Sequence, residues 1–378
     1  MGIEKIASGS EKAKVLIVAA KLSIGGAEKV ARDIALMDSS DEFEYHYIVF
    51  GNHVGEYESQ LEDKGCRIIH MPEPSENYRV YWRALRDLMK KENYLVVHAH
   101  TMFNCGWAMW AAKRCGVPVR IAHSHSALVH GGGFVKTVYE KLMRTLILTC
   151  ATDLVGCGET AGRRLFGKNA WKKRGNLVLN GIDVTSFAYD SQKRNAIRAQ
   201  LRLGDRFVMG HAGHLAEVKN QTFLLDLMPG ILKRRPDTML LLLGEGNDRL
   251  MLEQKIHDME LENHVIMTGN VTNVADYLSA MDVFVFPSLF EGTPLSILEV
   301  QANSLPCVIS NSVPPDVFLT DLIHPLSLQA PKDAWVDLIL NQQRTDTQRY
   351  HEQLRSSDYA VENAMAKIYC IYNKRNHQ

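Results

Sequence analysis

The sequence predicts an α/β protein built from two doubly wound domains. Short apolar runs alternate with segments of helical periodicity along the whole 378-residue chain, and this alternation is typical of parallel sheets covered by helices. The pattern breaks around Asn180-Gly181-Ile182-Asp183 and then restarts. A chain of this length is long for one hydrophobic core and comfortable for two.

The apolar runs predict the strands. In the first half they lie at residues 15–20, 45–50, 67–70, 95–98, 119–123 and 152–156. In the second half they lie at residues 206–210, 239–243, 265–268, 283–286 and 307–309. We expect domains over residues 1–185 and 186–358, with residues 359–378 packing back on the first domain through a helix that begins near residue 358. Ligand sites of such domains lie at the carboxyl ends of the strands, and we expect the two sites to face each other across a cleft.

Composition and charge exclude several classes of protein. The formal net charge is zero, which argues against a nucleic-acid-binding protein. No apolar run is long enough to span a membrane, and the start of the chain lacks the apolar core of a signal peptide. The seven cysteines include no Cys-x-x-Cys pair, so neither a zinc site nor a redox motif is indicated. We expect a cytoplasmic protein.

The most informative segment follows the predicted strand at 283–286. It carries two carboxylates around a Gly-Thr-Pro turn, and Pro294 suits the first turn of a helix because its missing N–H costs nothing there. Free N–H groups at a helix start attract phosphate, and carboxylates accept hydrogen bonds from hydroxyl groups. The segment could therefore hold a nucleotide sugar. The expected contacts are Glu291, Gly292, Thr293, Pro294, Leu295, Ser296 and Glu299.

Two simpler explanations must be weighed. A helix entry with an exposed glutamate gives the same Glu-x7-Glu spacing, which is common in long chains. Near the N-terminus, Gly25-Gly26-Ala27-Glu28 could be a plain turn between a strand and a helix. The Gly-x-Gly-x-x-Gly fingerprint of dinucleotide-binding domains is absent, which argues against a dehydrogenase.

Histidines gather at the ends of two predicted strands, at His98, His100, His123, His125 and His130. Alternating His-x-His places both rings on one face of an extended strand, a pattern that can bind metal. No carboxylate or cysteine joins the cluster locally, so we expect no metal. We expect His98 and His100 to be structural residues at strand ends.

Taken together, the motifs resemble those of the family 4 retaining glycosyltransferases, which have the two-domain B-type fold with two Rossmann-like domains. The resemblance covers residues 14–372 and rests on the segment 290–299, Gly25-Gly26-Ala27-Glu28, Asn180-Gly181-Ile182-Asp183, Gly213-His214-Leu215, Lys219-Asn220 and Gly244-Glu245-Gly246. A narrower likeness to the capsular and exopolysaccharide branch rests on the segments 120–125, 165–167 and 316–327.

The resemblance implies roles for individual residues. Glu291 would bind hydroxyls of the transferred sugar, Glu299 the ribose diol and Lys219 the diphosphate. An arginine often stands in the family where this chain has His214, so either Lys219 carries most of the charge on the diphosphate or His214 is held protonated there. An ordinary loop histidine is the alternative.

Further contacts are implied at strand ends in both domains. His123, with His125 as its competitor, would contact the transferred sugar, so the residues expected to take part in catalysis are His123, Lys219 and Glu291. The remaining implied contacts are Gly25 and Gly26 near the diphosphate and acceptor, Gly244 at the cleft edge, and Asn270 and Val271 against the base.

The implied activity is metal-independent transfer of a hexose from a nucleoside diphosphate sugar, with uridine diphosphate (UDP) favoured by the branch. The acceptor would be a glycan or a lipid-linked sugar, and no cofactor is expected. In this family the acceptor attacks the face from which the diphosphate leaves, so no residue needs to act as a nucleophile. A nucleotide-sugar epimerase on the same fold and a non-catalytic nucleotide-sugar-binding protein stay open as alternatives.

Two segments of the first domain, at residues 81–91 and 134–144, mix basic and apolar side chains. Such a mixture suits a peripheral contact with the inner face of a membrane, where a lipid-linked acceptor would lie. An ordinary solvated helix face explains the same pattern.

Overall fold

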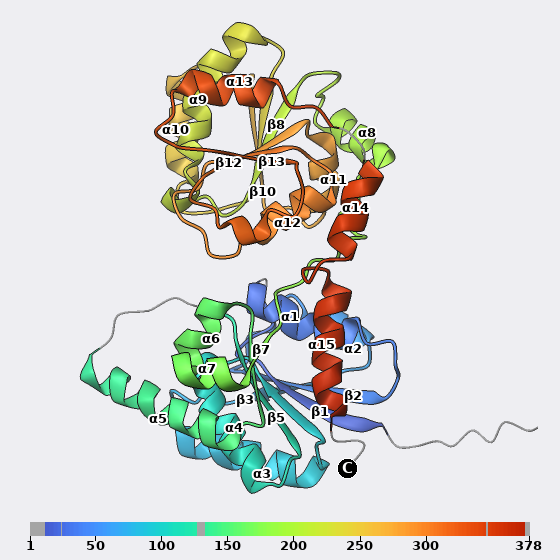
Figure 1. Cartoon of the computed structure of the whole chain (residues 1–378), viewed down its shortest axis with the longest axis vertical. Coiled ribbons are helices and arrows are strands. Elements are labelled where there is room, and N and C mark those ends of the chain that lie inside the picture. The colour runs from blue at the N-terminus through green and yellow to red at the C-terminus, as the bar shows by residue number, and fades with distance from the viewer. Residues whose placement is uncertain (1–11, 24, 127–132, 345–346, 375–378) are drawn as a thin grey trace, which may run out of the picture. The chain divides into compact units, whose positions relative to one another are not determined.

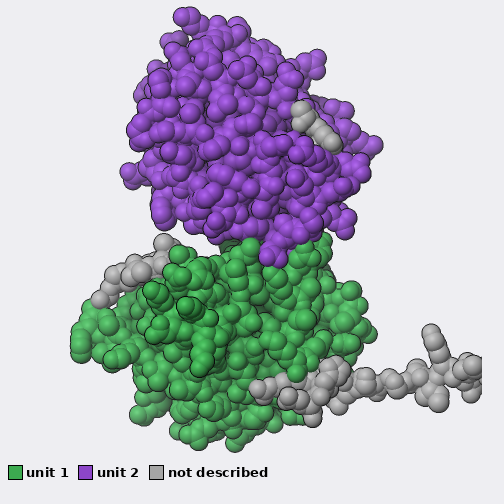
Figure 2. All heavy atoms as spheres, in the orientation of Figure 1, with its two compact units in different colours: residues 1–181, 361–378 green, residues 182–360 purple. Residues whose placement is uncertain are grey.

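The computed structural model describes residues 12–23, 25–126, 133–344 and 347–374. The chain forms two compact units (Figures 1 and 2). Unit 1 contains residues 1–181 and 361–378, and unit 2 contains residues 182–360. The sequence predicts these limits at residues 185 and 358.

Unit 1 contains a seven-stranded parallel sheet with the order β3-β2-β1-β4-β5-β6-β7. Its strands are β1 (Ala13–Val18), β2 (Phe43–Phe50), β3 (Arg67–Met71), β4 (Val96–Ala99), β5 (Val119–Ser124), β6 (Asp153–Gly156) and β7 (Gly175–Leu177). The strand order reverses between β1 and β4, the point at which doubly wound sheets bind their ligands.

Helices cover both faces of this sheet. They are α1 (Gly26–Leu36), α2 (Glu58–Asp63), α3 (Tyr78–Glu92), α4 (Cys105–Arg114), α5 (Phe134–Cys150), α6 (Glu159–Phe166), α7 (Lys168–Arg174) and α15 (Val361–Asn373), with a short 3-10 helix η1 (Met102–Asn104). Successive residues of a strand point to opposite faces. Val15 and Ile17 therefore join a core with α1 and α15, whereas Leu16 and Val18 join a second core with α3, α4 and α5.

Unit 2 contains a six-stranded parallel sheet with the order β10-β9-β8-β11-β12-β13. Its strands are β8 (Val208–Ala212), β9 (Met239–Leu243), β10 (Val265–Gly269), β11 (Val283–Phe286), β12 (Cys307–Ser310) and β13 (Ile323–Leu326). Here the order reverses between β8 and β11.

The helices of unit 2 follow the same alternation. They are α8 (Ser191–Gln200), α9 (Gln221–Arg234), α10 (Arg249–Asp258), α11 (Val274–Ala280), α12 (Leu295–Ala302), α13 (Lys332–Leu340) and α14 (Thr347–Arg355), with the 3-10 helices η2 (Glu217–Lys219) and η3 (Pro315–Val317). The α9 and α13 helices pack with β8, β9 and β11 in one core that includes Leu224, Leu242, Val285 and Trp335.

The prediction of two doubly wound parallel sheets is confirmed, and so is the return of the C-terminal helix to the first domain. In Figure 1 the α15 helix lies beside α1. The expected single helix from residue 358 was wrong in its start, because α15 begins at Val361. Among the described residues, no helix has the length and apolar character needed to cross a membrane.

The remaining errors lie at element ends and sheet edges. The first strand, β1, spans Ala13–Val18, whereas the sequence predicts residues 15–20. The β8 strand spans Val208–Ala212, whereas the sequence predicts residues 206–210. The sequence does not predict β7 and β13, because these strands lie at sheet edges and lack a continuous apolar run. Pro294 is the N-cap residue, one position before α12, instead of lying in its first turn.

Candidate active site

In unit 2 the candidate site lies where the strand order reverses, at the carboxyl ends of β8 and β11. Lys219 ends the 3-10 helix that follows β8, and Glu291 lies in the loop between β11 and α12. The Lys219 Nζ is 2.7 Å from the Glu291 Oε1, and the two side chains are 21% and 10% exposed. The ammonium also lies 5.0 Å from the centre of the Phe286 ring. A lysine and a glutamate that are distant in the sequence thus form a half-buried ion pair.

Backbone contacts hold these two loops together. The Leu289 N–H donates to the Val218 carbonyl oxygen at 2.8 Å. The Asn220 side-chain amide donates to the Pro287 carbonyl oxygen at 3.1 Å, and Asn220 adopts a left-handed backbone with φ of 56°. The loops that carry Lys219 and Glu291 are therefore fixed by the fold, and the ion pair does not have to order them by itself.

The start of α12 adjoins the ion pair. The Ile297 N–H donates to the Pro294 carbonyl oxygen at 3.1 Å, whereas the first N–H groups of any α-helix have no acceptor within the helix. The N–H groups of Leu295 and Ser296 can donate hydrogen bonds to a bound anion. Glu299, half-buried on the same helix, lies about one turn further along. Gly292 and Thr293 are exposed in the loop before the helix.

Two further loops pack backbone against backbone at this edge. The Leu215 N–H donates to the Glu245 carbonyl oxygen at 2.9 Å. Gly244 has φ of 129°, and a Cβ built there would lie 2.2 Å from the Gly213 carbonyl oxygen, so only glycine fits. His214 is exposed, and its carbonyl oxygen accepts from the Gln221 side-chain amide at 2.9 Å. The two residues expected to contact the base follow β10. Asn270 is exposed and Val271 is half-buried.

Unit 1 has a cavity of about 710 Å³ at the corresponding edge of its sheet. Segments that follow β1, β2, β3, β4 and β5 all contribute to its wall. The lining residues are Ala20, Lys21, Gly26, Ala27, Glu28, Phe50, His53, Glu73, His100, Thr101, Met102, Asn104, His125, Ser126 and Asn180. Met102 has a left-handed backbone with φ of 51°, a conformation that is costly for this residue type and that recurs at functional sites.

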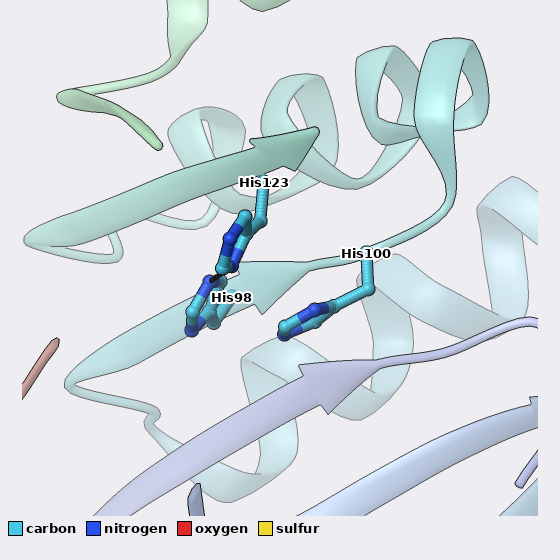
Figure 3. A group of neighbouring side chains, drawn as sticks. All are labelled: His98, His100 and His123. Atoms are coloured by element: carbon cyan, nitrogen blue, oxygen red, sulfur yellow. Dashed lines mark hydrogen bonds between the residues drawn. The ribbon is translucent and has the colours of Figure 1, made fainter. Parts of the chain in front are cut away.

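Four histidines form two hydrogen-bonded pairs beside this cavity. The His98 Nε2 lies 3.2 Å from the His123 Nδ1, and the His98 Nδ1 lies 2.8 Å from the Tyr372 hydroxyl of α15. The His100 Nδ1 lies 2.8 Å from the His125 Nε2. Figure 3 shows His98 and His123 projecting from β4 and β5, with His100 beside them. The side chains of the two strands thus converge.

Burial keeps these imidazoles neutral. It lowers the pKa of His98 to about 3 and the pKa of His125 to about 4. Burial and the neighbouring histidines also hold the pKa values of His100 and His123 well below the usual value. Neutral imidazoles donate and accept hydrogen bonds but carry no charge for a phosphate, so the histidine side of this cavity suits hydroxyl groups.

The histidines that the sequence groups together differ in their position relative to the cavity. His123 is fully buried, whereas His125 and His100 line the cavity, so His125 is better placed than His123 to meet a ligand with its side chain. His100, expected from the sequence to be a structural residue, is buried and borders the cavity. His130 lies outside the described residues.

Two residues at the cavity wall belong to motifs already named, Gly26 to the glycine pair at residues 25–26 and Asn180 to the domain junction. Gly25 is the N-cap residue of α1 and Gly26 its first residue, and a Cβ on Gly26 would lie 4.0 Å from the Asn180 side-chain nitrogen. Asn180 has a buried oxygen with no hydrogen-bond partner among the described residues. The sequence marked it only as part of the domain junction, although an unpaired buried oxygen at a cavity wall points to a ligand.

Comparison with known proteins places this geometry in a family. Residues 193–341 match the family described as glycosyl transferases group 1, and residues 25–181 match the glycosyl transferase 4-like domain. The chain is 32% identical over 373 residues to the putative glycosyltransferase EpsF of Bacillus subtilis, covering 96% of this chain and 97% of EpsF.

Two further relatives match a smaller part of the chain. The chain is 32% identical over 243 residues to the Escherichia coli UDP-Gal:alpha-D-GlcNAc-diphosphoundecaprenol alpha-1,3-galactosyltransferase, covering 60% of each. It is 24% identical over 305 residues to the capsular polysaccharide biosynthesis glycosyltransferase CapH of Staphylococcus aureus, covering 79% of this chain and 81% of CapH.

The fold agrees with a solved structure. The crystal structure of Anabaena HepE in complex with UDP superposes with a TM-score of 0.76 at 18% identity, covering 95% of this chain and 98% of HepE. With two parallel sheets of this topology and an almost full-length match to EpsF, the chain belongs to the group 1, or family 4, glycosyltransferases of the B-type fold.

Proposed function

We propose that this protein is a retaining hexosyltransferase that moves a sugar from a UDP-sugar to a lipid-linked or glycan acceptor in exopolysaccharide or capsular polysaccharide biosynthesis. The observation that carries the proposal is the Lys219–Glu291 pair, 2.7 Å apart beside the start of α12. It combines one cation, one carboxylate and a set of free N–H groups at the point where the strand order reverses.

Each part of this constellation suits one part of a nucleotide sugar. The Lys219 ammonium and the α12 N–H groups are donors for the diphosphate. Glu291 accepts hydrogen bonds from hydroxyls of the hexose, and Glu299 accepts them from the ribose diol. Asn270 and Val271 lie beyond β10, where the base would meet backbone groups.

The proposed reaction needs no covalent intermediate with the protein. The acceptor hydroxyl attacks the anomeric carbon on the face from which UDP departs. A new C–O bond forms as the bond to the diphosphate breaks, and the proton passes to the departing phosphate oxygen. Lys219 and the start of α12 stabilise the charge that develops on the diphosphate.

For the acceptor we propose the unit 1 cavity. Its His125 imidazole is neutral and lies beside Asn180, a pair that can recognise hydroxyl groups. Among the relatives, the E. coli enzyme is named for an acceptor linked to diphosphoundecaprenol. A polyprenyl-linked acceptor of that kind would be presented at a lipid bilayer.

The α5 helix suits such a bilayer. Phe134 and Val135 are 83% and 82% exposed, and Val138 and Leu142 are half exposed on the same helix. Their positions, one and two turns apart, place them on one side of α5. Exposed Lys136 and Lys141 lie among them. Apolar side chains flanked by lysines are typical of a helix that lies at the surface of an anionic membrane.

The first experiment is a thermal-shift screen of the unaltered chain against UDP, GDP, ADP and their sugars. A ligand at 100 times its Kd stabilises the native state by about 2.7 kcal/mol, which corresponds to a shift of about 5–10 °C for a unit the size of unit 2. We expect the shift with UDP compounds, its loss in Lys219→Met, and its retention in Lys233→Met, which alters an exposed lysine of α9.

The second experiment measures transfer from the stabilising UDP-sugar to a polyprenyl-diphosphate-linked sugar, with product configuration read by NMR. Retention of the anomeric configuration is expected, and inversion would overturn the proposed chemistry. Vesicle flotation tests the membrane contact. Phe134→Ser with Val135→Ser should abolish binding to anionic vesicles, whereas Leu250→Ser, which alters an exposed leucine of α10, should not.

A further inference from the structure

Three histidines of unit 1 form a compact group of nitrogen donors behind the cavity. One nitrogen from each of His98, His100 and His123 lies within 4.8 Å of the other two. The three side chains are buried, and Figure 3 shows them converging from β4, the segment after β4, and β5. Three imidazoles are a common ligand set for a zinc ion with one open position.

The hydrogen bonds of the group leave the required lone pairs available. When His98 donates from its Nδ1–H to the Tyr372 hydroxyl, 2.8 Å away, its Nε2 keeps a lone pair. When His100 donates from its Nδ1–H to the His125 Nε2, 2.8 Å away, its own Nε2 keeps a lone pair. Metal-binding histidines have this kind of outer partner, which fixes the tautomer and the ring orientation.

Two ring nitrogens of this group are buried without a hydrogen bond to any described residue. Within the part of the chain that the structure describes, the buried His100 Nε2 and His123 Nε2 have no hydrogen-bond partner. An unpaired buried polar atom destabilises the folded state, because it has lost its hydrogen bonds to water. A cluster with a purely structural purpose would be expected to satisfy them, whereas a metal ion would use the His100 Nε2 directly.

The spacing also suits a metal. The His98 Nε2 and His123 Nδ1 are 3.2 Å apart, close to the separation of about 3.3 Å between two nitrogen ligands of a tetrahedral zinc ion. Because all the donor atoms lie within 4.8 Å of one another, the third imidazole would need to move by at most about 1.5 Å to reach the same spacing.

We propose that His98, His100 and His123 bind one divalent cation of the zinc type at the carboxyl edge of the unit 1 sheet. The ligand atoms are the Nε2 of His98, the Nε2 of His100 and the Nδ1 of His123, whose proton moves to its Nε2. Imidazole donors favour Zn²⁺, Cu²⁺ or Ni²⁺ over Mg²⁺ and Ca²⁺, which prefer oxygen ligands. His100 also borders the cavity, from which a water molecule can supply the fourth ligand.

The test uses Co²⁺ as a spectroscopic probe for Zn²⁺. The full-length protein is treated with a chelator, desalted and titrated with Co²⁺, and the visible absorption of four-coordinate cobalt is recorded. We expect one equivalent of Co²⁺ to bind and one equivalent of Zn²⁺ to displace it. No visible absorption in the unaltered protein would overturn the proposal.

Variants distinguish this site from adventitious binding. His100→Gln should abolish the absorption, whereas His257→Gln, which alters an exposed histidine paired with Glu262, should not change it. Absorption that persists in His100→Gln would overturn the proposal. Circular dichroism and thermal unfolding show whether each variant is folded.

Tyr372→Phe provides a milder change, because it keeps the ring that packs edge-on against Phe43 and removes only the hydroxyl beside His98. Loss of an outer partner typically weakens metal binding 10- to 100-fold, and we expect a change of about this size in the Co²⁺ titration. An unchanged affinity in Tyr372→Phe would overturn the assignment of the His98 Nε2 as a ligand.

Discussion

The Lys219–Glu291 contact leads to a prediction in which a mutation tightens nucleotide binding. In the protein without donor, the Lys219 ammonium is paired with the Glu291 carboxylate at 2.7 Å. A diphosphate that binds Lys219 must share the lysine with this carboxylate, which repels it. Glu291→Gln removes the negative charge and keeps the shape of the side chain. UDP affinity should therefore rise while sugar transfer falls.

The size of the effect follows from the geometry. A phosphate oxygen bound to Nζ would lie about 5 Å from the Glu291 carboxylate, and two unit charges at that distance repel by about 3 kcal/mol at an effective dielectric constant of about 20. The two side chains are 21% and 10% exposed. Hydration and the lysine itself screen most of this repulsion, leaving about 1 kcal/mol, or about a fivefold gain in affinity.

Isothermal titration calorimetry with UDP measures the change directly, at low and high salt. The gain should shrink as salt screens the charges. Lys219→Met is the opposing control, because losing a hydrogen bond to a charged group should weaken UDP binding by about 10- to 150-fold. UDP affinity in Glu291→Gln that is equal to or lower than that of the unaltered chain would refute the reasoning.

Four further outcomes are expected. Glu299→Ala should weaken UDP binding by about 1–2 kcal/mol in calorimetry, because a carboxylate acceptor for the ribose diol is lost; unchanged affinity would contradict that role. Burial lowers the pKa of His211 to about 4, so unit 2 should lose about 2 kcal/mol of stability between pH 7 and pH 5, where the unfolded chain binds a proton that the folded chain excludes; urea unfolding should show this loss largely removed in His211→Gln. Gly244→Ala should cost about 2–4 kcal/mol in urea unfolding, because its Cβ would meet the Gly213 carbonyl oxygen. Gly292→Ala should change stability by less than about 0.5 kcal/mol, since its Cβ meets no described atom within 4 Å.

The sequence predicted the central parts of both sheets well. The β9 and β11 strands have the bounds expected from their apolar runs, Met239–Leu243 and Val283–Phe286, because strands buried on both faces are apolar throughout. Edge strands lack this signal. The β7 strand reads Gly-Asn-Leu, and β13 includes Pro325, a residue that sheets tolerate at their edges.

For the site, the sequence indicated which residues to consider but not their contacts. Lys219 and Glu291 are 72 positions apart, and their pairing depends on hydrogen bonds that join two loops. The alternation of His98 and His100 predicted a shared face, yet the contact of His98 with Tyr372 joins positions 274 apart. The second contact depends on the packing of α15, and no local pattern in these segments could reveal either contact.

The return of α15 to unit 1 has a consequence for how the protein is made. During synthesis, residues 13–177 emerge first with all seven strands of the unit 1 sheet, but the helix that covers Val15 and Ile17 emerges only after the whole of unit 2. Domains usually fold in order as the chain emerges from the ribosome. Here the later unit can complete its core first, while the nascent earlier unit exposes an apolar face that chaperones can recognise.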